Sequence, residues 1–342
     1  MYFLQAGPPL LISEDVGGSV FVDIGVNVIA VYISACILLP LLTDFGLMEF
    51  VGTLARPFFR RVFQLPGRAA IDGVTSFVGA SAIGLLISIG QYNRGNYTDR
   101  EACVIATNFS VVSLPFCLVV ATVAGIESYF IPWYGFVIIV CLIAALITPR
   151  LPPLSTKADT YIATADIAAI EDAAGSHSLL REAWHSALQR AAKAPGVKAF
   201  LTSGLVNLAF FLFSVLTAAL ALATFAALIV FHTPVFSWLG SPFVILLEFA
   251  QLPEASTAAP ALFSGFLEMY MPAITASNIQ SELTSFVLAG LAVSQLLFMS
   301  EVGVIILRSS LPLSIIDLVM IFLLRTAIAL PVLVLGAHLI VS

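Results

Sequence analysis

The chain has 342 residues, of which 60% are hydrophobic and only 10% charged, and its mean hydropathy is +1.06. Soluble domains carry about 25% charged residues, so this composition excludes a soluble globular protein and indicates an integral membrane protein. The formal net charge is −6 and the sequence has no basic stripe, so nucleic acid is not an expected partner.

Common catalytic and metal-binding patterns are missing from the sequence. No GxxxxGK[ST], HExxH or GxSxG motif occurs, so we expect neither an enzyme nor an organic cofactor. The four cysteines lie inside apolar segments without ligand-like spacing, which predicts no disulfide framework and no metal site. They are Cys36, Cys103, Cys117 and Cys141.

Eight apolar segments are long enough to cross about 30 Å of hydrocarbon. In chain order they are residues 20–43, 68–92, 99–123, 127–149, 197–232, 255–278, 282–307 and 311–341. The polar segment 150–196 separates them into two sets and is predicted to be a cytoplasmic connector. It contains an amphipathic helix pattern with Leu180, Trp184 and Leu188 on one face.

The basic residues distinguish two topologies. If all eight segments cross, the positions of Lys and Arg divide between both sides, against the positive-inside rule. If residues 68–92 and 255–278 instead enter and return as re-entrant hairpins, the basic residues outside the spans all become cytoplasmic. We therefore predict six crossings of a bacterial inner membrane with both termini outside. Gly and Ser inside the two hairpins suit a turn, although close helix packing is the alternative explanation.

Two phrases occur in both halves of the chain. The first match pairs PFFRRVFQLP (57–66) with PFVILLEFAQLP (242–253), and the second pairs YTDREACVIAT (97–107) with QSELTSFVLAG (280–290). In the second match, Thr98 and Ser281 are the expected helix N-caps, and Glu101 completes a capping box. Coincidence is the alternative, but the matches keep their order and spacing. Three crossings per half would place the second half upside down, as in many secondary transporters.

The predicted fold is therefore all-α, an inverted repeat of three transmembrane helices plus one re-entrant hairpin per half, with interfacial helices. The first membrane half spans 1–149 with its hairpin at about 66–96. The connector spans 150–196, and the second half spans 197–342 with its hairpin at about 253–279.

Three stretches carry a resemblance to a known family. ARPFFRRVFQLPGRAAIDGVTSFVGASAIGLL, YTDREACVIATNFSVVS and FSGFLEMYMPAITASNIQSELTSFVLAGLAVSQLLFMSEVG resemble bacterial membrane proteins with "nucleoside recognition" Gate domains. The resemblance runs from about residue 50 to the C-terminus, apart from the connector, and the layout is distantly similar to the core of concentrative nucleoside transporters. It implies a cation-coupled, elevator-like carrier that forms a homo-oligomer. Gate domains also occur in ferrous-iron transport proteins, but the absence of a suitable Cys or His arrangement counts against iron.

Polar residues near the middle of the apolar segments are the candidate site. At 1.5 Å of rise per residue, Glu268, Gln295 and Arg325 each lie about 20 to 25 Å along their segments. Pro115 is expected to break its helix at the same depth. The candidate solute ligands are Gly79, Ser81, Asn108, Ser110, Ser113, Ser264, Gly265, Glu268, Ser294 and Gln295, and the candidates for ion coupling or a charge pair are Glu268, Glu301 and Arg325.

Each candidate also has a structural interpretation. Arg325 either contacts solute or locks the fold through a salt bridge to Glu301, Asp317 or Glu268. The Ser, Asn and Gln side chains are equally suited to ordinary interhelical hydrogen bonds. Asp72 is expected near headgroups or as a helix cap, with a gating contact as a minor alternative.

The function predicted from these residues is alternating-access transport of a small polar organic solute, coupled to H⁺ or Na⁺. The solute is either a nucleoside or nucleobase, or an amino acid or small peptide. The alternative is a non-transporting membrane scaffold that retains a Gate-like fold and works through its connector.

Overall fold

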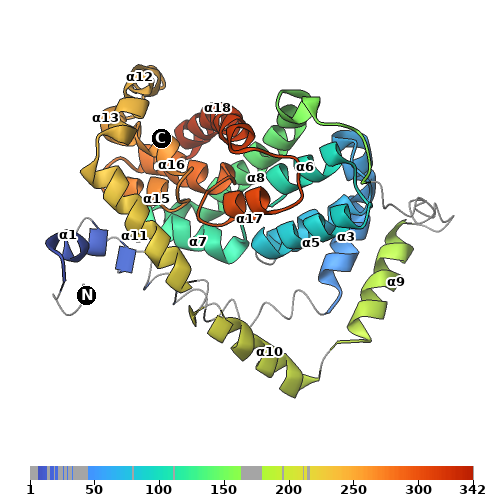
Figure 1. Ribbon diagram of the computed structural model, residues 1–342. Coiled ribbons are helices and arrows are strands. Elements are labelled where there is room, and N and C mark those ends of the chain that lie inside the picture. Colours follow the sequence, from blue (N-terminus) through green and yellow to red (C-terminus); the bar gives the residue numbers. More distant parts are fainter. Residues whose placement is uncertain are drawn as a thin grey trace.

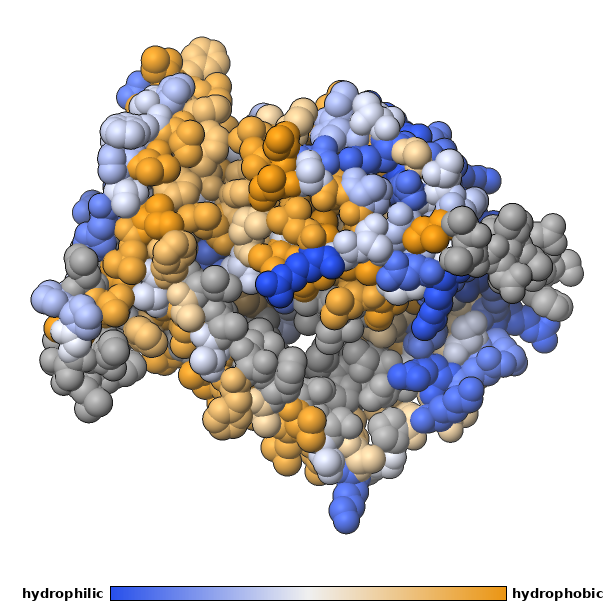
Figure 2. All heavy atoms as spheres, viewed as in Figure 1, coloured by the Kyte–Doolittle hydropathy of each residue, from blue (hydrophilic) through white to orange (hydrophobic). Residues whose placement is uncertain are grey.

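The computed structural model shows an all-helical protein over the residues that it describes. These are 7–13, 16–18, 20–21, 26, 29, 33, 45–78, 81–110, 112–162, 179–194, 196–210, 212–213 and 216–341. Figure 1 shows a central bundle that contains α8, α15, α16 and α18, with α10 and α11 along its outer edges. Hydrophobic side chains spread over much of the surface seen in Figure 2, as expected for a protein that faces lipid.

The first half and the connector contain short and long helices in alternation. After α1 (Pro9–Ile12) come α3 (Leu47–Phe58), a π-helix (Phe59–Phe63), α4 (Ala69–Val78), α5 (Ser81–Asn93), α6 (Asp99–Asn108), α7 (Leu114–Val123) and α8 (Phe130–Ile147). Short 3₁₀ helices follow or flank α8 at Glu127–Tyr129, Thr148–Arg150 and Leu154–Thr156. The predicted connector helix is confirmed as α9 (Leu179–Ala191).

The second half also contains both short and long helices. Its helices are α10 (Val197–Phe210), α11 (Leu216–His232), α12 (Val235–Phe249), α13 (Ala255–Ala258), α14 (Ala261–Ser264), α15 (Met271–Ser277), α16 (Glu282–Ser294), α17 (Val302–Arg308) and α18 (Ile315–Ile340). The bundle is held partly by Trp133 of α8, whose Nε1 donates to the carbonyl of Phe286 in α16 at 3.2 Å.

Two helices in the described part of the chain are long and apolar enough to cross a membrane, Glu127–Arg150 and Ile315–Ile340. A third candidate is the pair Ala223–Val230 and Val235–Phe249, which is bent by 66°. The predicted crossing at 197–232 is divided between α10 and α11, and the one at 20–43 falls mostly outside the described residues. The number of crossings and the side of each terminus stay predictions.

The predicted crossings 99–123 and 282–307 are each interrupted. α6 ends at Asn108 and α7 begins at Leu114, where Pro115 lies in the first turn and cannot donate a backbone hydrogen bond. The break expected from Pro115 is therefore confirmed. α16 ends at Ser294, and α17 begins only at Val302. Leu296 lies in this second interruption with a left-handed φ of 61°, a conformation that cannot continue a right-handed helix.

The first predicted hairpin folds back on itself. In α4 and α5, Ser88 Oγ donates to Asp72 Oδ2 at 3.3 Å, and a methyl group on Gly84 would overlap Ser76. Both pairs have residue 80 as their midpoint, so the two helices run antiparallel. Residues 79 and 80 themselves lie outside the described residues. In the second half, α13 and α14 turn back along α15. Whether either hairpin re-enters the membrane stays a prediction.

The repeated Gln-Leu-Pro motif has the same local structure in both halves. Gln64 and Gln251 have left-handed φ values of 56° and 58°, and each follows a helical arm with an interior proline. The next residues, Leu65 and Leu252, are both buried. Thr98 and Ser281 are confirmed as N-caps of α6 and α16, and Glu101 completes the capping box. These matches support the repeat, while its inversion across a membrane is still a prediction.

Candidate functional site

The two interrupted helices meet at Arg325. This residue lies on α18 with a side chain that is 0% exposed. Its Nε and Nη2 donate to the carbonyl oxygen of Ser294 at 3.0 and 2.7 Å, and its Nη1 donates to Asn108 Oδ1 at 2.8 Å. Ser294 is the last residue of α16 and Asn108 the last of α6. One guanidinium therefore bridges the carboxyl ends of both interrupted helices.

Arg325 is matched electrostatically by these helix ends. The last carbonyls of a helix lack intrahelical donors and carry partial negative charge, so a cation is favoured there. Among the described residues, no ion pair joins Arg325 to Glu268, Glu301 or Asp317, and the Asp317 carboxylate instead pairs with Lys157 at 3.0 Å. The salt bridge considered from the sequence does not form in this conformation, because the helix ends supply the compensating charge.

Asn108 is fully engaged by the fold. Its Oδ1 accepts from Thr148 Oγ1 at 2.7 Å as well as from Arg325, and its Nδ2 donates to the carbonyl of Val104 at 3.2 Å. The Thr148 hydroxyl lies at the end of α8. In this conformation Asn108 is therefore a structural link between α6, α8 and α18.

The second hairpin turns directly against the interruption that follows α16. Met299 N donates to the carbonyl of Phe266 at 2.8 Å, and Ser300 N donates to that of Leu267 at 3.1 Å. We refer to residues 264–270, from the last residue of α14 to the residue before α15, as the hairpin tip. The tip and the interruption are thus joined by two backbone hydrogen bonds.

Glu268 lies at the hairpin tip, and its side chain is only 4% exposed. Its Oε1 accepts a hydrogen bond from Tyr270 N at 3.4 Å, and the Ser300 side chain also bonds the carboxylate. Glu301, which is half-buried, is the N-cap residue of α17 and interacts electrostatically with Glu268. The structure therefore brings the two predicted coupling carboxylates together and leaves Arg325 with other partners.

Gln295 lies between the hairpin tip and α18. Its Nε2 donates to the carbonyl of Leu262 and to Thr326 Oγ1, both at 2.9 Å. Its Oε1 and the neighbouring Ser294 Oγ are buried, and neither has a hydrogen-bond partner among the described residues. A methyl group on Gly265 would overlap Gln295 Oε1, so the tip backbone lies directly on this oxygen. Buried polar atoms without partners are rare and call for an explanation.

The other predicted ligands have local roles or lie outside the description. Ser110 Oγ donates to the carbonyl of Ala106 at 2.9 Å, and Ser264 Oγ donates to that of Ala261 at 3.4 Å. Ser113 is buried and precedes α7 without a side-chain capping bond. Ser81 begins α5, but its side chain is outside the described residues, as is the whole of Gly79.

Asp72 does not face headgroups as expected. It is buried between α4 and α5, where its Oδ2 accepts from Tyr97 Oη at 2.7 Å and from Ser88 Oγ. Burial and the neighbouring carboxylate raise the pKa of Tyr97 above its ordinary value, so its phenol stays protonated and donates. The sequence signal for this cluster is Tyr97 directly before the N-cap Thr98. The cluster was not predicted, because Asp72 and Tyr97 come together only when the hairpin closes.

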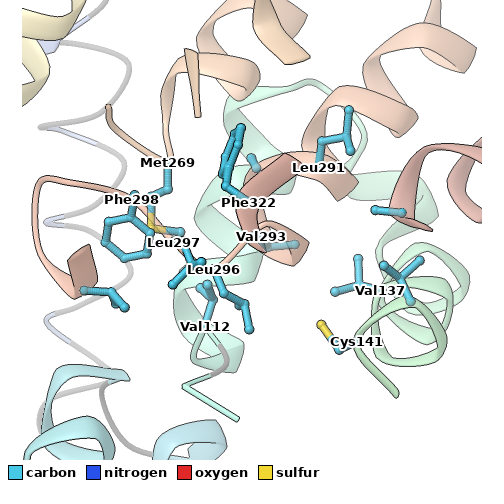
Figure 3. Close-up of a cluster of buried hydrophobic side chains, with 14 of the residues drawn as sticks. Val112, Val137, Cys141, Met269, Leu291, Val293, Leu296, Leu297, Phe298 and Phe322 are labelled. Carbon is cyan, nitrogen blue, oxygen red and sulfur yellow. The ribbon is translucent and has the colours of Figure 1, made fainter. Parts of the chain in front are cut away.

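Apolar side chains surround the hairpin tip and the interruptions. Figure 3 shows Met269 of the tip, Val112 of the first interruption, and Leu296, Leu297 and Phe298 of the second, all lying close together. These side chains are buried. They exclude water from the polar groups nearby, and hydrogen bonds and charges are stronger in such surroundings.

The fold and these residues define a helical membrane protein. Residues 26–127 match the Gate family, which is described as nucleoside recognition. The chain is also 44% identical, over 338 residues, to an uncharacterized protein of Alkalihalophilus pseudofirmus, an alignment that covers 99% of this chain and 73% of that protein. No solved structure matches the chain. The chain belongs to the same family as that protein, and its residues 26–127 carry a Gate domain.

Proposed function

We propose that the protein is a secondary carrier that moves a small polar organic solute across the bacterial inner membrane by alternating access. The observation that carries this proposal is a pair of buried polar atoms at the end of α16 without partners among the described residues, Ser294 Oγ and Gln295 Oε1, of which Gln295 Oε1 lies against the hairpin tip at Gly265. Displacement of the tip would uncover Gln295 Oε1 at the end of an interrupted helix, where carriers of this general plan bind their solutes. The carrier would work as a homo-oligomer.

The environment of Arg325 bears on the class of solute. A zwitterionic amino acid or peptide would need a cation for its carboxylate, but Arg325 is already bonded to Ser294 and Asn108. The remaining groups are the Gln295 amide oxygen, which accepts, and the Ser294 hydroxyl, which both donates and accepts. Uncharged groups of this kind suit the N–H, O–H and carbonyl groups of a nucleoside or nucleobase. We therefore favour that class over the amino acid class.

Glu268 is the proposed coupling residue, through H⁺ or Na⁺. It is buried at the element proposed to move, and among the described residues it has no ion pair with a basic side chain. A carboxylate in such a place costs free energy unless it binds a cation or proton. Movement of the tip would expose it to a different solution and allow exchange.

The test is uptake by the full chain in proteoliposomes, with nucleosides, nucleobases, amino acids and dipeptides offered under H⁺ or Na⁺ gradients. We expect gradient-dependent uptake of a nucleoside or nucleobase, and loss of the gradient dependence in Glu268→Gln. Glu282→Gln, which changes an exposed carboxylate, is the matched control. Unchanged gradient dependence in Glu268→Gln would remove Glu268 from the coupling mechanism.

The scaffold alternative is favoured by one observation. Arg325, Asn108 and Thr148 are bonded to one another and leave few free polar groups for a solute. No uptake and no thermal stabilisation with any solute, from protein shown to be folded, would support the scaffold and contradict the carrier.

A further inference from the structure

The apolar side of α9 is left uncovered by the described part of the chain. Leu180, Trp184 and Leu188 recur every four residues, and they are 62%, 60% and 50% exposed. α9 contacts α3 through a different side, where Ala183 is buried and Glu182 pairs with Arg56 at 2.6 Å. The sequence predicted this apolar stripe, and apart from an edge contact between Trp184 and α3 the fold leaves it exposed.

α3 presents a second exposed stripe that continues the first. Leu47, Val51 and Phe58 are exposed and share one side of the helix by their spacing, while Gly52 faces α4 on another side. The rings of Phe50 and Trp184 meet edge to face at 6.3 Å between centroids and join the two helices. We define the α3–α9 face by its six exposed residues, Leu47, Val51, Phe58, Leu180, Trp184 and Leu188.

The border of the α3–α9 face is positively charged. Arg61, at the end of the arm formed by α3, is exposed, as are Arg181 and Lys193 on and after α9. The two acidic residues between the helices are already paired, Glu182 with Arg56 and Glu49 with Arg190 at 3.6 Å. A partner of this face therefore meets exposed hydrophobic side chains, with exposed basic residues close to them in the sequence.

We infer that the α3–α9 face lies in the headgroup layer of an anionic phospholipid leaflet. Helices with an apolar side and a basic border bind such surfaces, with apolar side chains below the phosphates and basic ones beside them. Trp184 has the side chain most favoured at that depth. Lipid is preferred to a protein partner because the charge is complementary and because the connector joins two membrane halves. The inference does not depend on transport activity.

Brominated lipids test the depth of Trp184 in the full chain. The protein is placed in nanodiscs of phosphatidylglycerol and phosphatidylcholine with bromine on the acyl chains, in a Trp238→Phe background that removes the other exposed tryptophan. The quenched signal of Trp184 is the difference between this protein and Trp184→Phe/Trp238→Phe. We expect strong quenching by bromine and little quenching by acrylamide in water.

The charge of the border is tested by moving the bromine from one lipid to the other. We expect brominated phosphatidylglycerol to quench Trp184 more than brominated phosphatidylcholine, with loss of that preference in Arg181→Gln/Lys193→Gln. Arg308→Gln, an exposed arginine on α17, is the matched control and should keep it. Quenching by acrylamide alone would place the face in water and overturn the inference. Protection from both quenchers would assign the face to a protein partner and overturn it equally.

Discussion

At the scale of single residues, Arg325 shows how a buried charge is accommodated without a carboxylate. Its Nε, Nη1 and Nη2 donate hydrogen bonds to the ends of α6 and α16, which are far apart in sequence. The geometry depends on a planar guanidinium, because one ammonium group on a flexible stem cannot bond both helix ends in the same way.

We predict that Arg325→Lys lowers the thermal stability of the protein in detergent. Loss of the bridge leaves buried acceptors on Ser294 and Asn108 with weaker partners, at a cost of about 1 to 3 kcal/mol for an unsatisfied group. Exposed Arg308→Lys is the control and should leave the unfolding midpoint unchanged. An Arg325→Lys variant that keeps full stability but loses solute binding would instead make Arg325 a solute ligand.

Gly265 gives a second prediction at this scale. Gly265→Ala places a methyl group against Gln295 Oε1, so we expect the hairpin tip to be displaced and stability to fall by about 1 to 3 kcal/mol. Gly90→Ala is the control, because no other atom lies within 4 Å of an added methyl group there. Thermal unfolding of the single variants and of Gly265→Ala/Gln295→Ala checks the contact. Purely additive effects in the double variant would show that the two residues do not interact.

At the scale of elements, the interrupted helices are specified by their two ends. Hydroxyl side chains cap the first turns of α6 and α16, and Pro115 begins the helix after the first break. Chemistry of this kind is local, so the caps and the first break were predicted correctly. The second interruption has no proline, and its left-handed Leu296 has no signal in the sequence.

Removal of the caps tests whether the two elements are equivalent. Thr98→Ala and Ser281→Ala should each cost about 1 kcal/mol of stability, because a donor in the first turn loses its acceptor. Thr202→Ala, in the exposed part of α10, is the control. Unfolding midpoints in detergent provide the measurement. A large loss for one cap and none for the other would argue that the two helices are not structural equivalents.

At the scale of the whole molecule, the two Gln-Leu-Pro arms test the inverted repeat. Gln64 and Gln251 are exposed and share a backbone conformation, but the prediction places them on opposite sides of the membrane. We expect a membrane-impermeant maleimide to label Gln64→Cys only from the cytoplasmic side and Gln251→Cys only from the outer side. The parent chain reports the background from its own cysteines, of which Cys103, Cys117 and Cys141 are buried. Labelling of both variants from one side would reject the inversion.

The sequence by itself determined the membrane class, the repeated arms, the helix caps, the break at Pro115, the amphipathic connector helix and the Gate resemblance. Apart from the resemblance, which rests on likeness to a known family, each follows from composition, periodicity or neighbouring residues. Only the tertiary structure decided which polar groups meet, because Arg325 reaches Asn108 across 217 positions and Asp72 reaches Tyr97 only when the hairpin closes. Spacing along separate helices places residues at one depth, whereas contact depends on how those helices pack and rotate. The same packing also decided that the apolar side of α9 faces outward.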